Sequence, residues 1–173
     1  AIRATAEEQG VALSVHAPYF INLNADQKQW PASRERLMKA ARAGFKAGAT
    51  DIIFHPASYL GHPPEQVYPI VRDRLAAAVA ELRGEGNSVT LRPETMGKSA
   101  MFGTLEETIR LSREIDGVLP CIDLAHLHAR RGAFNDAQLL REINRVFRED
   151  GGNYLSAFVP TLASLGRDFG EAG

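Results

Sequence analysis

The feature that most constrains the fold of this chain is the alternation of short apolar runs with longer amphipathic segments. The apolar runs are rich in Val, Ile and Leu and are bounded by Gly, Asn or Pro, which is typical of parallel strands buried on both faces. They cover residues 11–18, 50–57, 88–95 and 118–126. The amphipathic segments predict helices over residues 34–49, 65–86, 104–115 and 135–150. This alternation predicts a parallel sheet, either doubly wound or closed as a barrel.

Length and composition fit an ordinary globular domain. The chain has 173 residues and a net charge of −1, and no linker divides it, so we interpret residues 1–173 as one α/β domain. No apolar run approaches the roughly 18 residues of a membrane span. Because the net charge is close to zero, any contact with a polyanion would depend on a local patch or on bound metal ions. The single cysteine, Cys121, is expected to be a core thiol in a cytoplasmic protein.

Side chains that can bind metal stand at or near the carboxyl ends of the predicted strands. They are His16, His55, Glu94 and Asp123, with His126 three residues after Asp123. The strand ends of a parallel barrel converge on one mouth, so these side chains are expected to meet there. Imidazole nitrogens and carboxylate oxygens bind Zn²⁺ at roughly 2 Å. A carboxylate can also bridge two ions about 3.5–4 Å apart, as two-metal phosphoesterases require.

Each of these residues has a plainer interpretation when it is taken alone. A histidine after a strand is commonly a satisfied core or loop residue, Glu94 could pair with Arg92, and Asp123 could cap a helix. Five residues of metal-ligand type stand at corresponding places in four strand–helix units. This favours a shared metal site over five unrelated placements. His62 is interpreted as a solvated loop residue or a support for the site. His128 is interpreted as an exposed loop residue or a substrate contact.

Four ordered motifs carry a resemblance to a known family. The segments "HAPYFINL", "FHPASYLGH", "RPETMGK" and "CIDLAHLHARRG" resemble the successive metal-site motifs of the endonuclease IV family of apurinic/apyrimidinic endonucleases. The resemblance runs from about residue 10 to about residue 150. It implies a xylose-isomerase-like fold, a partial TIM-type β/α barrel with parallel strands. It also implies a zinc-dependent DNA-repair endonuclease that cleaves the phosphodiester 5′ to abasic sites in double-stranded DNA.

The resemblance also assigns metal ligands. His16, His55 and Glu94 would bind a first Zn²⁺ ion, with Mn²⁺ as the alternative metal. Glu94 would be the catalytic carboxylate that bridges to a second ion, which Asp123 also binds. His126 would bind a third ion. Because the sequence offers no nucleophilic Ser or Cys with a base at suitable spacing, metal-activated water is the expected nucleophile.

Three further residues are candidates for contact with DNA. Tyr19 matches the family position that enters DNA at the lesion, although a core aromatic is an equal alternative for this residue. Arg130 and Arg131, beside the expected mouth, are interpreted as phosphate contacts or as an exposed, solvated pair. In the family mechanism the DNA is bent and the lesion is flipped out of the helix.

Parts of the family pattern have no counterpart in this chain. No histidine follows His128, and residues 157–173 match none of the later metal motifs. A TIM barrel usually needs about 250 residues, so we interpret the chain as incomplete at both ends, with one of up to three ion sites fully supplied. We therefore expect cleavage to be slower than in a complete barrel, and we expect exposed sheet edges that favour association.

Two other functions stay open at this level. A sugar isomerase or epimerase of the same superfamily would use a Glu/Asp/His site around one divalent ion. The retained His16, the tyrosine loop and "HPAS" favour the nuclease, because the isomerases generally lack that histidine pattern. The second alternative is an inactive barrel remnant that binds metal weakly or only packs against a partner.

Overall fold

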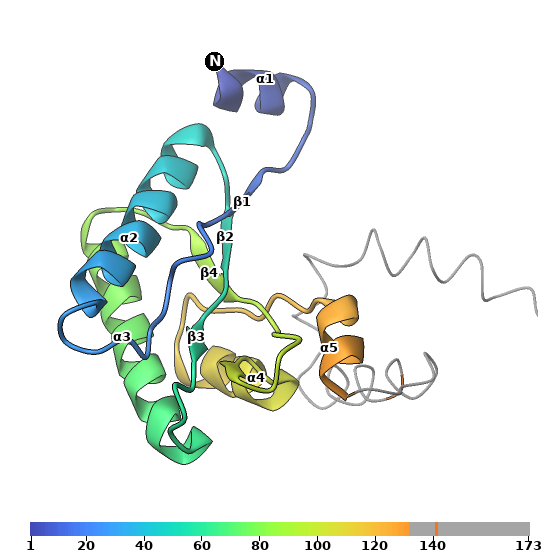
Figure 1. Cartoon of the computed structure of the whole chain (residues 1–173). Helices are drawn as coiled ribbons and strands as arrows, with labels where there is room; N and C mark the ends of the chain where they lie inside the picture. The colour runs from blue at the N-terminus through green and yellow to red at the C-terminus, as the bar shows by residue number, and fades with distance from the viewer. Residues whose placement is uncertain (132–140, 142–173) are drawn as a thin grey trace, which may run out of the picture. The chain divides into compact units, whose positions relative to one another are not determined.

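The computed structural model of this chain describes residues 1–131 and residue 141 (Figure 1). Residues Ala1–Arg130 form one compact unit. The helix predicted over residues 135–150 lies outside the described residues, apart from position 141. The assignment of residues 1–173 to a single domain stays a prediction.

A parallel sheet in the order β1–β2–β4 lies at the centre of this unit. Its strands are β1 (Ser14–His16), β2 (Asp51–Phe54) and β4 (Thr90–Pro93). Ser14 pairs with Asp51, and Asp51 pairs with Thr90. Each strand lies inside a predicted apolar run, which confirms the parallel α/β fold. The strands are shorter than the runs because prolines, which have no N–H to donate, follow β1 and β2 closely and end β4.

The strand predicted over residues 118–126 is wrong for most of its length. In the described part of the chain it forms only isolated bridges, from Val118 to Leu91 and from Cys121 to Glu94. The ladder is interrupted between the bridges because Pro93 of β4 has no N–H to donate to the carbonyl oxygen of Leu119. From Leu124 the chain is helical, as α5 (Leu124–Arg131). The segment nevertheless runs beside β4, so Asp123 still lies near the carboxyl end of that strand.

The core lies between the sheet and two long helices. Figure 1 shows α2 (Trp30–Ala47) and α3 (Pro64–Gly84) side by side, and α2 also contacts β1 and β2. Both helices have a proline in the first turn, where its missing N–H costs nothing. They bury the apolar stripes that predicted them, including Leu37 from α2 and Leu75 from α3. Each fully buried side chain of this size contributes about 1.5–3 kcal/mol to folding.

Two shorter helices complete the described unit. The first, α1 (Ile2–Glu8), precedes β1, and the second, α4 (Leu105–Glu114), follows β4. The predicted capping box of α4 is confirmed, because Thr104 Oγ1 accepts the Glu107 N–H at 3.1 Å and the Glu107 carboxylate accepts the Thr104 N–H at 2.9 Å. Among the described residues, no helix has the length and apolar character that a membrane span requires.

A small antiparallel pair joins the loops that follow β2 and β4. It consists of β3 (Ala57–Ser58) and β5 (Met101–Phe102), with Ala57 opposite Phe102. The hydroxyl of Tyr59 donates to the Glu107 carboxylate at 2.8 Å, which ties β3 to the start of α4. Strands of two residues show no detectable alternation, so the sequence did not predict them. They brace the loops at the carboxyl end of the sheet.

Candidate metal centre

Parallel register places three of the predicted ligands at one edge of the sheet. Phe54 and Pro93 are paired at the ends of β2 and β4, and His55 and Glu94 are the residues that follow them. His16 is the last residue of β1. One ligand atom from each of His16, His55 and Glu94 lies within 4.8 Å of the others. The predicted meeting of these side chains is confirmed, and their binding of a metal ion stays a prediction.

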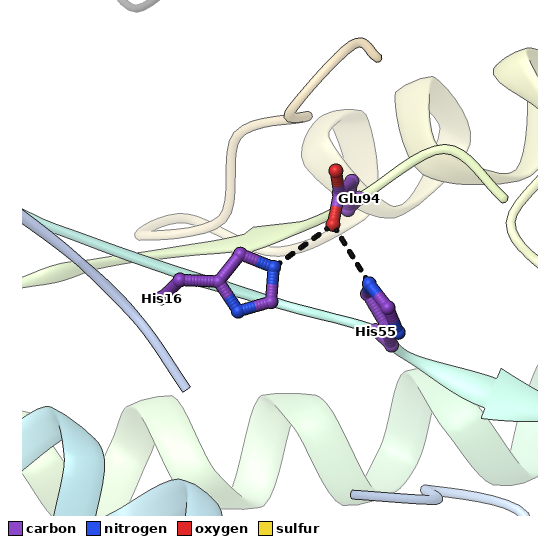
Figure 2. Close-up of side chains that lie close together, drawn as sticks. All are labelled: His16, His55 and Glu94. Carbon is purple, nitrogen blue, oxygen red and sulfur yellow. Dashed lines mark hydrogen bonds and ion pairs between the residues drawn. The ribbon is translucent and has the colours of Figure 1, made fainter. Parts of the chain in front are cut away.

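Both histidines approach the same oxygen of Glu94. Nε2 of His16 and Nε2 of His55 each lie 3.1 Å from Oε2 of Glu94 (Figure 2). Glu94 is 7% exposed. Burial alone would raise the pKa of the Glu94 carboxyl, but hydrogen bonds from His55 and His16 outweigh burial and hold this pKa below its ordinary value. Glu94 is therefore a buried carboxylate that stays ionised at neutral pH.

The contacts of His16 show that this group of atoms suits a cation. Nδ1 of His16 lies 2.8 Å from the carbonyl oxygen of Ala17. A carbonyl can only accept, so Nδ1 carries a proton, and Nε2 is the ring nitrogen directed at Oε2 of Glu94. At 3.1 Å a proton on Nε2 can join this nitrogen to the carboxylate oxygen, and a metal ion bound by both atoms at roughly 2 Å would fit the same separation. The donor set, two imidazole nitrogens and one carboxylate oxygen, is one that Zn²⁺ binds in proteins.

A second cluster contains Glu94, Asp123 and His126. Nδ1 of His126 lies 3.7 Å from Oε1 of Glu94 and 3.6 Å from Oδ2 of Asp123. Oδ1 of Asp123 accepts the His126 backbone N–H at 2.8 Å, so Asp123 does cap α5, as its plainer interpretation held. Its other oxygen remains directed at the cluster. The resemblance assigned His126 to a third ion, whereas the structure groups it with Glu94 and Asp123.

Thr95 organises the second cluster, and sequence reasoning missed it. Its hydroxyl accepts the Asp123 N–H at 2.8 Å, and its carbonyl oxygen lies 2.9 Å from Nδ1 of His126. The Nδ1–H of His126 therefore donates to Thr95, so the second cluster satisfies this proton without a metal ion. In the first cluster Nδ1 of His16 is held in the same way, by the carbonyl oxygen of Ala17, and two imidazole nitrogens lie 3.1 Å from one carboxylate oxygen. Of the two, the first fits a cation better.

Tyr19 lies over the histidines at the mouth. Its ring centroid is 5.0 Å from that of His55 and 5.7 Å from that of His16. The residue is 73% exposed, so it is not a core aromatic. An exposed ring above the ligands is available to a substrate that enters this mouth.

Of the two arginines proposed to contact phosphate, Arg130 is bound to a loop of the chain. Nη1 of Arg130 donates to the carbonyl oxygens of Met96, Lys98 and Met101 at 3.1, 2.9 and 2.9 Å, so this side chain fixes the loop after β4. Its contact with phosphate stays a prediction. The side chain of Arg131 lies outside the described residues.

Four other residues lie outside the two clusters. His62 and His128 are both exposed, and neither belongs to the two clusters. Cys121 is buried, as expected for a core thiol. The guanidinium of Arg92 pairs with Asp51 and donates to the carbonyl of Pro120, while Glu94 faces the histidines.

Comparison with known proteins identifies the family. Residues 1–157 match a family model described as "Xylose isomerase-like TIM barrel". The chain belongs to this family. Fold class and the site at the carboxyl ends of the strands agree with it, since TIM-barrel enzymes build their active sites at that end of the barrel.

Curated relatives match this chain over part of their own length. The chain is 37% identical over 130 residues to an uncharacterized protein of Methanocaldococcus jannaschii, covering 74% of this chain and 47% of that protein. It is 32% identical over 133 residues to a probable endonuclease 4 of Staphylococcus carnosus, covering 70% of this chain and 43% of the relative. The chain thus spans about half the length of the curated relatives it matches.

Solved structures that are named for different activities share this fold. Endonuclease IV from Thermus thermophilus superposes with a TM-score of 0.67 at 24% identity, covering 84% of this chain and 52% of that chain. An L-ribulose 3-epimerase superposes with a TM-score of 0.60 at 15% identity, covering 73% of this chain and 46% of that chain. At these identities the likeness shows the fold alone.

Proposed function

We propose that this chain carries the metal centre of a zinc-dependent endonuclease that hydrolyses the phosphodiester 5′ to abasic sites in DNA. The observation that carries the proposal is the convergence of His16 and His55 on one oxygen of buried Glu94, beneath the exposed ring of Tyr19. The relative named probable endonuclease 4 supports the same activity.

The side chains would have separate roles in such a site. His16, His55 and Glu94 would hold the ion, which when bound lowers the pKa of a coordinated water and stabilises negative charge on a phosphoryl oxygen. The hydrogen bond from Nδ1 of His16 to Ala17 keeps the ring in place and leaves Nε2 free to bind. Burial of Glu94 excludes water from one side of the site.

Two further residues would act on the DNA and on the leaving group. Tyr19 would pack its ring against the sugar at the lesion, where the missing base leaves apolar surface uncovered. Asp123 directs Oδ2 toward the second cluster, where it can hold a second cation or a proton near the leaving oxygen.

A second candidate is a divalent-metal sugar epimerase. The fold shared with L-ribulose 3-epimerase leaves it open, because one fold can host different activities. The relative named probable endonuclease 4 favours the first candidate.

One assay separates the two candidates. The chain, loaded with zinc, is incubated with a duplex that contains one tetrahydrofuran abasic analogue, which cannot undergo elimination, so a nick with a 3′-hydroxyl end reports hydrolysis. We expect zinc-dependent nicking 5′ to the analogue, no nicking of the undamaged duplex, and loss of nicking in Glu94→Gln. Absence of nicking at every zinc concentration, together with interconversion of ketose epimers, would establish the second candidate instead.

A further inference from the structure

A groove of about 550 Å³ lies beside the candidate metal centre. It is lined by the loop that follows β1, by the first turns of α2 and by the small antiparallel pair. A separate hollow at the metal centre is lined by His55 and His126 among others. Tyr19 and Met101 line both hollows, so the groove continues the mouth of the metal centre away from His55.

The lining of this groove is cationic. Lys28 and Arg36 line it, and the described residues place no Asp or Glu in its lining. Arg36 donates from Nη1 to the carbonyl oxygen of Phe20 at 3.2 Å. In the part of the chain that the structure describes, neither Lys28 nor Arg36 forms an ion pair with a carboxylate. In a chain with a net charge of −1, this is a local positive patch next to the site.

The groove also presents two exposed aromatic side chains. Tyr19 is 73% exposed and Phe20 is 79% exposed, although large apolar side chains are usually covered. The same loop is held firmly, because Arg74 donates to the carbonyl oxygens of Leu23 and Ala25 at 2.7 Å. Aromatic faces beside cations are the combination that binds a nucleic-acid strand through its bases and phosphates.

We propose that this groove binds the DNA strand that continues from the scissile phosphate, with Lys28 and Arg36 at its phosphates and Phe20 against a base or sugar. The inference rests on the proposed function and extends it, since it names the residues that position the substrate outside the metal centre. Lys28 and Arg36 are positioning residues and touch no reacting atom.

Salt dependence of binding tests the role of the two cations. Binding of the zinc-loaded chain to the tetrahydrofuran duplex is measured by fluorescence anisotropy over a range of salt concentrations. Each phosphate contact contributes about 0.9 to the slope of log K against log salt. We expect Lys28→Ala to reduce the slope by about 0.9 and the double variant Lys28→Ala, Arg36→Gln by about 1.8. Arg36→Lys keeps the charge, so its slope should equal that of the wild type.

Two further variants separate charge at the groove from charge elsewhere and from stacking. The double variant Lys39→Ala, Lys46→Ala removes two charges from α2 that do not line the groove, and its slope should match the wild type. Phe20→Ala should weaken binding by roughly 5- to 150-fold and leave the slope unchanged. Zinc content should be the same in every groove variant.

The outcomes distinguish this inference from the proposed function. If the wild type binds and nicks the duplex but the groove variants keep its slope, the groove inference is overturned and the endonuclease proposal stands. An equal loss of slope in the Lys39→Ala, Lys46→Ala control also overturns it, because the effect would then be one of overall charge. If the zinc-loaded wild type neither binds nor nicks the duplex, the proposed function fails and the inference fails with it.

Discussion

Nδ1 of His126 lies 3.7 Å from Oε1 of Glu94, yet its proton is directed to the carbonyl oxygen of Thr95 at 2.9 Å. The opposite oxygen of the same carboxylate faces the two other histidines, both at 3.1 Å. One oxygen of this carboxylate is therefore approached by two imidazole nitrogens, and the other by a single nitrogen whose proton is directed elsewhere. The difference indicates which cluster binds the first ion.

His55→Ala should lower zinc affinity by more than about 100-fold. Loss of a mere supporting hydrogen bond at a metal site typically costs 10–100-fold, and this change removes one of the three converging donors. Affinity is measured by competition with a chromophoric chelator. His62→Ala is the matched control, since His62 is an exposed histidine outside both clusters. Equal affinity of the two variants would remove His55 from the site.

Thr95→Val should destabilise the fold while leaving the first ion in place. The change keeps the shape of the side chain but deletes the hydroxyl that accepts the Asp123 N–H, and a buried donor left unpaired costs about 1–3 kcal/mol. Urea denaturation measures the loss. Thr108→Val is the control, because the hydroxyl of this fully buried threonine only donates to carbonyls of its own helix. A larger loss in the control would contradict the role given to Thr95.

Gly103→Ala should cost about 1–3 kcal/mol of stability. Gly103 has a φ of 127°, and an added Cβ would lie 2.8 Å from the carbonyl oxygen of Glu94. The backbone of the shared carboxylate must then move, so zinc affinity should fall as well. Gly84→Ala places the same methyl group near the end of α3 with no atom within 4 Å and should be neutral or slightly stabilising. Thermal unfolding with and without zinc compares the two.

Cys121 should react slowly with iodoacetamide in the folded chain. Burial raises the pKa of this thiol to about 12, against about 8.5 for a free cysteine, and the thiolate is the reactive form. Because the folded-state pKa is the higher one, this group favours the folded state below pH of about 8.5, and that contribution is lost as the pH rises toward 12. Labelling at pH 8 should be much faster in urea than in buffer. Equal rates would show that Cys121 is accessible.

The first cluster could be predicted because its residues combine two strong signals. His16, His55 and Glu94 each follow or end an apolar run, and each is of a metal-ligand type, so strand position and chemistry agree. Parallel strands bring such positions together whatever the details of the helices. The register of β2 and β4, which pairs Phe54 with Pro93, then sets the contact.

Other parts could not be predicted, for physical reasons that differ. Thr95 acts through its hydroxyl and its backbone carbonyl, and a threonine beside a strand carries no signal of such a role. The run over residues 118–126 is apolar up to Ile122, as a buried strand would be, and its ladder is interrupted by Pro93 on the neighbouring strand, which the pattern within the run does not reveal. The dual use of Asp123, as helix cap and cluster member, depends on two oxygens that a sequence does not distinguish.

The most direct test of the metal centre is the number of zinc ions that remain bound after gel filtration, measured by mass spectrometry of the metal content. The wild type should retain one ion per chain tightly, because His16, His55 and Glu94 supply a complete three-donor cluster. Glu94→Gln, which keeps the shape of the side chain and removes its charge, should lose that ion. His126→Ala should keep it, since His126 is not one of the three residues of the first cluster. Retention of the ion in Glu94→Gln, or its loss in His126→Ala alone, would contradict the assignment of the first cluster as the zinc site.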